Sequence, residues 1–514
     1  MVVFTIITGK VQKIRKTVNG SVYVYERIPY YDPAIRNTKY HYKYTGKEDK
    51  GEVRKVRSVL PRRSLVYGPF IPIMDIVKQT GIQDMLKSYL TDGESQKVIA
   101  LAISKVVRPL PMSSIPTWYG GTYLSTVYPV NLDSPRNSEL MEKIGSSDIY
   151  RRFSQDLIKK LHPGNSLLYD ITSIPSYSSA SIFEYGHAKD HPELEQINLS
   201  LVMERDRHLP LSFEIYPGSI PDVTTLRGVV EQLQPVISDI ALILDRGFFS
   251  MDNLRLLREA EYIIAASFMR KEVKAVYSSA SKTVDRADNA IMYEGYPIFC
   301  RHVSFSMEDL ELQGYFYHDV RRESDERADL HRNIMERRKR IESLQVRRGI
   351  KKSIESIAGS YMRYITYRIE NNAVVTSARD NAISAAENRM GRFLLVYRGE
   401  YSGSSCLSVY RHRDAIEKAF RILKTDMDIF PLRDHKESTI RGTVFVFFLS
   451  LLIRSALRRG MESTKLNEKY SMERMFLELE KLHMIEDQNG DLKELERTKK
   501  QKDILDLLNS VSWW

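Results

Sequence analysis

The sequence contains very little cysteine. Cys300 and Cys406 are the only two cysteines in 514 residues, and they lie far apart. Two distant cysteines exclude a disulfide framework, and no cluster of histidine and cysteine has the spacing of a zinc site. We therefore expect the chain to work in a reducing compartment, for which the cytoplasm is the simplest choice.

Long hydrophobic runs are scarce too. The strongest, Val444 to Ile453, is about half as long as a bilayer requires, and Arg454 follows it. We interpret it as a buried helix. Residues 1–8 lack the basic segment and cleavage site of a signal peptide, and no glycine-rich phosphate loop is present. These absences favour a soluble intracellular protein and argue against a membrane protein or a nucleotide-driven motor.

Positive charge, in contrast, is plentiful at one end of the chain. The formal net charge is +11, and residues 1–64 contain 15 Lys and Arg against 5 Asp and Glu. The same region alternates apolar and polar residues, as in Ser21-Val-Tyr-Val-Tyr-Glu, which predicts short strands. One interpretation is a small β-unit with a solvated charged face. We favour a basic and aromatic surface that binds nucleic acid, because the charge is so unevenly distributed.

The remaining pattern predicts a mixed α/β protein. Residues 166–265 read as strand, hairpin, helix, strand, helix and strand, which is the order of a ribonuclease-H-like sheet. We expect this core to be interrupted by a large insertion and extended by additional helices. The predicted segments are a basic β-rich DNA-binding unit (1–64), a helical module (65–161), the first part of the catalytic core (162–265), an insertion (266–390), the second part of the core (391–460) and a helical C-terminal tail (461–514).

A long charged helix is predicted within the insertion. Residues 321–355 contain 12 Lys and Arg together with 7 Asp and Glu. Charged helices of this kind are commonly just solvated, and contact with DNA is the alternative. The sequence favours neither interpretation.

Two acidic residues end predicted strands. Asp170 ends the run that starts at Ser166, and Asp245 ends the run that starts at Ile240. An aspartate after an apolar run is common in α/β proteins, so each residue alone could be an ordinary strand end. The order of strand, hairpin, helix and strand between them is what favours a site.

A third acid, Glu417, lies in a predicted helix with Tyr410, Arg413 and Lys424. Arg413 follows Tyr410 by 3 positions, Glu417 by 7 and Lys424 by 14. On one continuous helix, all four side chains fall within an arc of roughly 60°. Alternatively, Glu417 and Arg413 form an ordinary i,i+4 ion pair, Tyr410 packs against neighbours and Lys424 is a surface residue.

Three carboxylates of this kind suit the cutting of phosphodiesters. Two hard cations hold the attacking and leaving oxygens in such reactions, and Mg²⁺ prefers oxygen ligands. Aspartates at strand ends and a glutamate on a helix can supply these ligands. The combination therefore indicates a two-metal site formed by Asp170, Asp245 and Glu417.

The chain resembles DDE transposases of the IS4 superfamily, and most closely the IS1634-like group, over roughly residues 60–460. The helix motif of that superfamily is matched without a substitution by Tyr410, Arg413, Glu417 and Lys424. One position departs from the pattern, because Ser250 stands where many members have an aromatic residue. Other similar blocks are Tyr169-Asp-Ile-Thr-Ser, Gly186-His-Ala-Lys-Asp, Pro217-Gly-Ser-Ile-Pro-Asp and Leu244-Asp-Arg-Gly-Phe.

The resemblance implies a DNA transposase. Asp170, Asp245 and Glu417 would hold two Mg²⁺ or Mn²⁺ ions, and cleavage of the element's ends would be followed by strand transfer into target DNA. The phosphates near the cut would be bound by Tyr410, Arg413 and Lys424. Such enzymes act as dimers on paired ends, so the partners would be terminal inverted repeats, target DNA and a second copy, in the cytoplasm at the nucleoid.

Two rival functions stay open. One is a metal-dependent nuclease of the same fold that hydrolyses DNA without strand transfer, since fold does not fix function. The other is an inactive regulator, derived from a transposase, that only binds DNA. The presence of all three acids argues against the regulator.

Overall fold

The computed structural model describes residues 10–18, 21–32, 37–49, 52–54, 61–161, 164, 166–178, 180–186, 194–235, 240–429, 432, 434–487 and 490–513. The protein is mixed α/β, as predicted. It divides into two compact units, Met1–Val66 with Lys481–Arg497 and Tyr67–Glu480 with Thr498–Trp514.

The smaller unit contains two sheets. The first has four antiparallel strands in chain order: β1 (Gln12–Val18), β2 (Ser21–Asp32), β3 (Asn37–Asp49) and β4 (Glu52–Arg54). The strands that the alternating pattern predicted are thus present. Basic groups lie over tyrosine rings on this sheet: Lys16 over Tyr42 at 4.8 Å and Arg27 over Tyr40 at 3.4 Å from the ring centroid.

The second sheet corrects the prediction of a helical tail. It joins β5 (Pro61–Val66) to a hairpin of β17 (His483–Asp487) and β18 (Leu492–Glu494). In the sequence, this hairpin follows α17 (Met472–Leu479) and precedes α18 (Lys499–Asn509). Arg62 donates a hydrogen bond to Glu486 at 3.2 Å across 424 positions of sequence. Because the partner strand is so distant in the chain, the local pattern of the tail did not reveal it.

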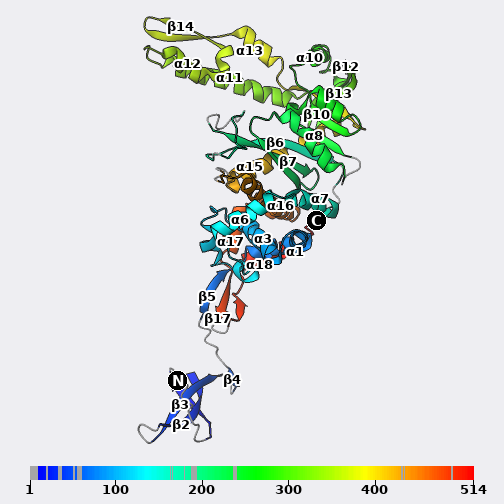
Figure 1. Ribbon diagram of the computed structural model, residues 1–514. Helices are drawn as coiled ribbons and strands as arrows, with labels where there is room; N and C mark the ends of the chain where they lie inside the picture. The colour runs from blue at the N-terminus through cyan, green and yellow to red at the C-terminus, as the bar shows by residue number, and fades with distance from the viewer. Residues whose placement is uncertain are drawn as a thin grey trace. The chain divides into compact units, whose positions relative to one another are not determined.

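Nine described strands form the sheet of the larger unit, in the order β11-β12-β13-β16-β10-β9-β6-β7-β8. Figure 1 labels β6, β7, β10, β12 and β13 of this sheet. β6, β9 and β10 are parallel neighbours, and β7 and β8 continue the sheet antiparallel. This arrangement of β6 to β10 confirms the ribonuclease-H-like prediction. The bounds are β6 (Ser166–Pro175), β7 (Gln196–Glu204), β8 (Pro210–Pro217), β9 (Ala241–Leu244), β10 (Glu261–Ala265), β11 (Ala290–Tyr293), β12 (Tyr296–Met307), β13 (Leu310–His318) and β16 (Arg392–Arg398).

The connecting helices follow the predicted order. α8 (Asp222–Leu233) links β8 to β9, and α9 (Met251–Leu256) links β9 to β10. α10 (Lys271–Ala280) then leads toward β11. Parallel strands need such crossovers, so α8, which lies between the two aspartates in the sequence, is part of the core.

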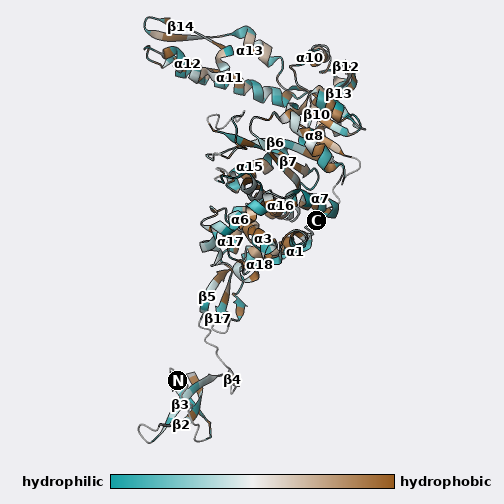
Figure 2. Cartoon of the chain, viewed as in Figure 1, coloured by the Kyte–Doolittle hydropathy of each residue, from teal (hydrophilic) through white to brown (hydrophobic). Residues whose placement is uncertain are grey.

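The predicted insertion, 266–390, divides into two parts. β11 to β13 belong to the central sheet, because β13 pairs with β16. The second part, residues 320–387, surrounds a hydrophobic cluster of its own, and we call it the arm. It comprises α11 (Val320–Glu342), α12 (Ile350–Ala358), β14 (Ile365–Glu370), β15 (Ala373–Ala378) and α13 (Asp380–Glu387). α11 leads away from the sheet, with α12 and β14 at its far end (Figure 1), and many of its residues are hydrophilic (Figure 2).

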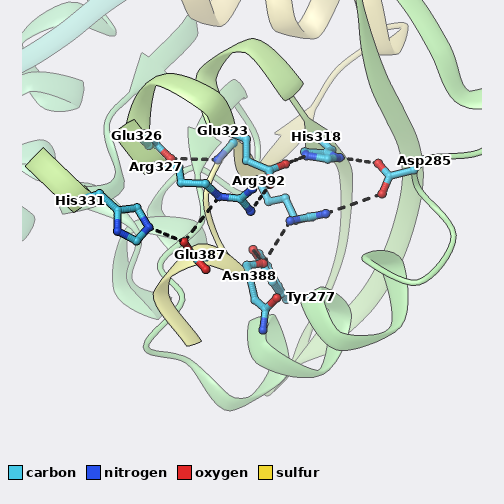
Figure 3. Close-up of polar contacts among 11 residues, drawn as sticks. Tyr277, Asp285, His318, Glu323, Glu326, Arg327, His331, Glu387, Asn388 and Arg392 are labelled. Atoms are coloured by element: carbon cyan, nitrogen blue, oxygen red, sulfur yellow. Dashed lines mark hydrogen bonds and ion pairs between the residues drawn. The ribbon is translucent and has the colours of Figure 1, made fainter. Parts of the chain in front are cut away.

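A network of charged side chains fixes the base of the arm to the sheet (Figure 3). His318, the last residue of β13, is 5% exposed, and its ring contacts Asp285 on one side and Glu323 of α11, at 2.5 Å, on the other. Arg392 of β16 lies 3.6 Å from Asp285, and Arg327 of α11 donates to Glu323 at 2.9 Å. The first turns of α11 are therefore held against β13 and β16.

Of the helices before the sheet, α1, α3 and α6 pack against α16 (Glu437–Ser463). The first of them begins at Phe70, because residues 65–66, which were predicted to open the helical module, belong to β5. Among the described residues, α16 alone is long and apolar enough to cross a membrane, and 89% of its apolar window is buried inside the structure. The prediction of a buried helix is confirmed. The other helices are α1 (Phe70–Thr80), α2 (Ile82–Lys87), α3 (Asp92–Val107), α4 (Ile115–Tyr119), α5 (Leu124–Val127), α6 (Ser134–Gly145) and α7 (Ile149–Leu161).

Candidate active site

Asp170 and Asp245 lie on neighbouring parallel strands. Where β6 pairs with β9, Tyr169 is opposite Leu244, so the next residues of the two segments are the two aspartates. Tyr169 and Leu244 are fully buried, which fixes both strands next to the aspartates. β6 continues beyond Asp170 to Pro175, so the prediction that the first strand ends at Asp170 was wrong, whereas Asp245 directly follows β9. Because neighbouring positions of parallel strands face the same side, the two carboxylates come to one edge of the sheet.

The turn after Asp245 is well packed. A 3₁₀ turn covers Arg246–Phe248, and the ring of Phe248 lies 5.0 Å from that of Tyr169. Ser250 begins α9, because its hydroxyl accepts a hydrogen bond from the amide of Asn253 at 3.2 Å. The serine that departs from the family pattern therefore acts here as a helix cap.

The helix predicted to carry Tyr410, Arg413, Glu417 and Lys424 is not continuous. At its first junction, the amide of Arg413 bonds to the carbonyl of Tyr410, three residues earlier. Side chains three residues apart eclipse in such a turn, so these two still share a face. The spacing of apolar residues in the sequence did not reveal this one tightened turn. The segment consists of α14 (Gly403–Arg411), α15 (Asp414–Arg421) and a π-helical turn (Ile422–Asp426).

One guanidinium group joins the three acids. Nη1 of Arg413 lies 3.1 Å from Oδ2 of Asp170 and 3.5 Å from Oδ2 of Asp245. Nη2 of the same side chain bonds to Oε1 of Glu417. The i,i+4 pair that the sequence offered as an alternative therefore forms, and the same guanidinium also contacts both aspartates. Three acids that are distant in the chain meet around a single cation.

Burial shapes the charge of this cluster. The side chain of Asp170 is 17% exposed, whereas those of Asp245 and Glu417 are 41% and 53% exposed. Burial raises the pKa of Asp170 to about 7; Arg413 opposes this shift, and the two other acids add to it. Burial also raises the pKa of Tyr410 to about 12, so its phenol stays protonated at neutral pH.

A cavity of about 180 Å³ lies beside Asp245. Tyr410 and Arg413 line it, together with Arg246 and Arg322, which the sequence analysis did not single out. Arg246 follows Asp245 directly, so its position was readable in the sequence. Arg322 comes from α11, and nothing in the local sequence connects that helix with the acids.

Lys424 lies apart from this cavity. It is half-buried in the π-helical turn Ile422–Asp426, and it is not among the described residues that line the cavity. Of the four motif residues, Arg413 and Glu417 thus belong to the acidic cluster, and Tyr410 and Arg413 line the cavity. The predicted phosphate contact of Lys424 stays a prediction.

The donor set suits hard divalent ions, because it consists of three carboxylates. Within the described ranges, no three His, Cys, Asp or Glu side chains are placed to hold a metal ion. Arg413 lies between the carboxylates and supplies the positive charge that an ion would otherwise bring.

The sheet order defines a ribonuclease-H-like protein, and the acidic cluster lies where β6 and β9 run side by side. The model of the transposase DDE domain family matches residues 163–453, more than half of the chain, and the chain belongs to this family. Its members are transposases. Among solved structures, the chain is similar to a piggyBac transposase synaptic complex with hairpin DNA, at 11% identity and a TM-score of 0.37, covering 81% of this chain and 80% of that one. A search of curated proteins finds no match.

Proposed function

We propose that this transposase cuts the DNA ends of an insertion sequence and joins the freed 3′-hydroxyl to target DNA. The main support is the convergence of Asp170, Asp245 and Glu417 on Arg413. Two-ion phosphodiester chemistry needs carboxylates at one point, and here three separate elements provide them. Within the family, we assign the chain to the IS1634-like group of the IS4 superfamily on its Tyr410-to-Lys424 motif.

Asp170, Asp245 and Glu417 would hold two Mg²⁺ or Mn²⁺ ions. When bound, such ions activate the attacking oxygen and stabilise the leaving oxygen of a phosphodiester. Arg413 neutralises the carboxylates while no ion is bound and keeps them close together. If ions were bound to these acids, the guanidinium of Arg413 would be available to a DNA phosphate.

The cavity beside Asp245 supports the binding of phosphates. Arg246, Arg322 and Arg413 all line it, and guanidinium groups bind phosphate through paired, charge-assisted hydrogen bonds. Tyr410 adds a protonated phenol that can donate a further hydrogen bond. These residues would position the DNA backbone next to the acids, with Lys424 binding a phosphate further along.

Three substitutions test the assignment of the acids. Asp170→Asn, Asp245→Asn and Glu417→Gln should each abolish cleavage of duplex DNA that carries an element end, while DNA affinity stays close to that of the wild type. Asp252→Asn is the matched control, because its side chain is 94% exposed, and it should cleave normally. Full cleavage by any of the three variants would remove that residue from the site.

A joining assay separates strand transfer from hydrolysis. The full chain is supplied with an element end bearing a free 3′-hydroxyl, a plasmid and Mg²⁺. Joined products support the proposal. Fragments alone would indicate the nuclease. DNA binding without any product would indicate the inactive regulator. We further propose a homodimer on paired inverted repeats, acting in the cytoplasm at the nucleoid.

A further inference from the structure

Charge changes abruptly along the arm. Residues 321–336 contain four Lys or Arg and five Asp or Glu. Residues 337–352 contain eight Lys or Arg and one Glu. The first part also forms ion pairs, such as that of Arg322 with Glu326 at 2.8 Å. A surface that is charged for solubility mixes both signs. The second part does not mix them, so solvation alone does not explain it.

The second part carries exposed cations that have no acidic partner among the described residues. We call residues 339–352, where α11 ends and α12 begins, the basic tip. Its one acid, Glu342, accepts a hydrogen bond from the amide of Thr376 at 3.2 Å. None of the six exposed cations forms an ion pair with a residue in the described ranges. They are Lys339, Arg340, Arg347, Arg348, Lys351 and Lys352.

The basic tip is held by apolar packing. Ile341 of α11 and Ile354 of α12 are fully buried in the hydrophobic cluster of the arm. The first turn of α12 contains Lys351 and Lys352 and no acid. Cations at this end of a helix oppose its dipole and lower its stability. The positive charge is thus concentrated on a fixed surface at a cost to folding, which indicates a role in binding.

We propose that the basic tip binds the phosphate backbone of duplex DNA without reading its sequence. Unpaired Lys and Arg side chains release counterions when they bind to DNA, and this gives affinity for any sequence. None of the exposed large hydrophobic residues among the described ones lies within 339–352. The tip therefore lacks the apolar centre typical of a protein–protein interface, and DNA is the better partner.

This DNA-binding surface is separate from the proposed chemistry. The basic tip lies at the end of α11 that is remote from β13, and none of its residues lines the cavity beside Asp245. It would bind DNA outside the cleaved position, on either the element or the target. Because it needs no metal ion, it can be tested without cleavage.

The test uses the full chain and a duplex of arbitrary sequence, in EDTA, at several salt concentrations. The variant carries Lys339→Gln, Arg340→Gln, Lys351→Gln and Lys352→Gln. We expect weaker binding, and a plot of log affinity against log salt that is less steep by about 0.9 for each DNA phosphate that is no longer neutralised. The control removes four cations that already have acidic partners, through Arg255→Gln, Arg332→Gln, Arg368→Gln and Lys436→Gln.

The two variants have the same net charge, so the comparison isolates the position of the cations. A larger decrease in affinity and in salt slope for the tip variant than for the control supports the proposal. An unchanged salt slope of the tip variant, or an equal change in both variants, overturns the proposal. It is also overturned if the tip variant binds polyglutamate more weakly than the wild type while its DNA binding is intact. Cleavage by the wild type is scored separately in Mg²⁺, so failure of the proposed chemistry is distinguishable. Melting temperatures confirm that both variants fold.

Discussion

At the scale of single residues, the site depends on the shape of one side chain. A guanidinium group has five N–H donors in a plane, whereas an ammonium group is a point charge with three. Arg413 uses two of its nitrogens to reach three carboxylates. This shape suits an arginine, rather than a lysine, to a position among three acids.

Replacing Arg413 by Gln should expose this dependence. Without the guanidinium, Asp170, Asp245 and Glu417 lose their common partner, and we expect unfolding to become easier by roughly 1–3 kcal/mol. The partial exposure of two of the acids keeps the loss at this level, since water screens them. Mn²⁺ should then raise the melting temperature of the variant more than that of the wild type. An equal rise in both proteins would show that Arg413 and the ions do not compete for the acids.

Lys105 gives a prediction about pH. It is 3% exposed, donates a hydrogen bond to the carbonyl of Leu110 at 2.6 Å and lies 5.0 Å over the ring of Phe447. Burial lowers its pKa to about 8. Since the unfolded value is about 10.4, the folded state binds fewer protons between these values, and stability from this group rises with pH across that window.

The variant Lys105→Met should therefore be more stable than the wild type at pH 7, by at most about 3 kcal/mol. The difference should shrink as the pH approaches 10, because the wild-type lysine is then neutral in the folded state and partly neutral in the unfolded state. Urea unfolding of both proteins at pH 7, 8.5 and 10 measures this. A difference that does not vary with pH would contradict the burial of a charged lysine.

At the scale of elements, the crossing of α6 and α16 requires glycine. A Cβ atom at Gly442 would lie 2.1 Å from the carbonyl oxygen of Met141, and one at Gly145 would lie 1.8 Å from that of Ser438. Backbone atoms cannot yield as flexible side chains do. The two helices therefore approach closely because neither has a side chain at the crossing.

Gly442→Ala should separate these helices and destabilise the protein by about 1–3 kcal/mol. Gly228→Ala on α8 is the matched control, because its nearest neighbour, the hydroxyl of Tyr216, would lie 3.6 Å away. At this position, the higher helix propensity of alanine should raise the free energy of unfolding by at most about 1 kcal/mol. Denaturant unfolding compares the two, and a neutral Gly442→Ala would show that the crossing is looser than described.

The elements also show how far sequence reasoning reaches. Asp170 and Asp245 were placed by strand patterns, because each pattern is local and their order fits one sheet. The tight turn at Arg413 was missed, since one shortened hydrogen bond leaves the apolar spacing unchanged. Arg322 and the pairing of β5 with β17 were missed for another reason: both depend on interactions between distant parts of the chain, which local periodicity does not encode.

At the scale of the whole molecule, the smaller unit contains most of the excess positive charge. Its first sheet combines lysine and arginine with tyrosine, a composition that suits the binding of a polyanion such as DNA. Its second sheet joins segments that are far apart in the sequence, because β5 pairs with β17. A deletion that tests DNA binding must therefore stop before β5.

Removing residues 1–54 should weaken DNA binding and flatten its salt dependence, because fewer counterions are released. β5 and its pairing with β17 are retained in this variant, so the rest of the protein should fold. Affinity for duplex DNA is measured at several salt concentrations, as for the basic tip. An identical salt slope after the deletion would make the four-stranded sheet a scaffold rather than a DNA-binding surface.

The central claim is that three distant acids form one ion-binding site, and crystals grown with element-end DNA and Mn²⁺ test it most directly. Anomalous scattering locates the manganese without reference to activity. We predict two Mn²⁺ peaks among Asp170, Asp245 and Glu417, with Arg413 turned from the acids toward a DNA phosphate. Arg413 still bonded to all three acids, with manganese bound elsewhere or absent, would contradict the account.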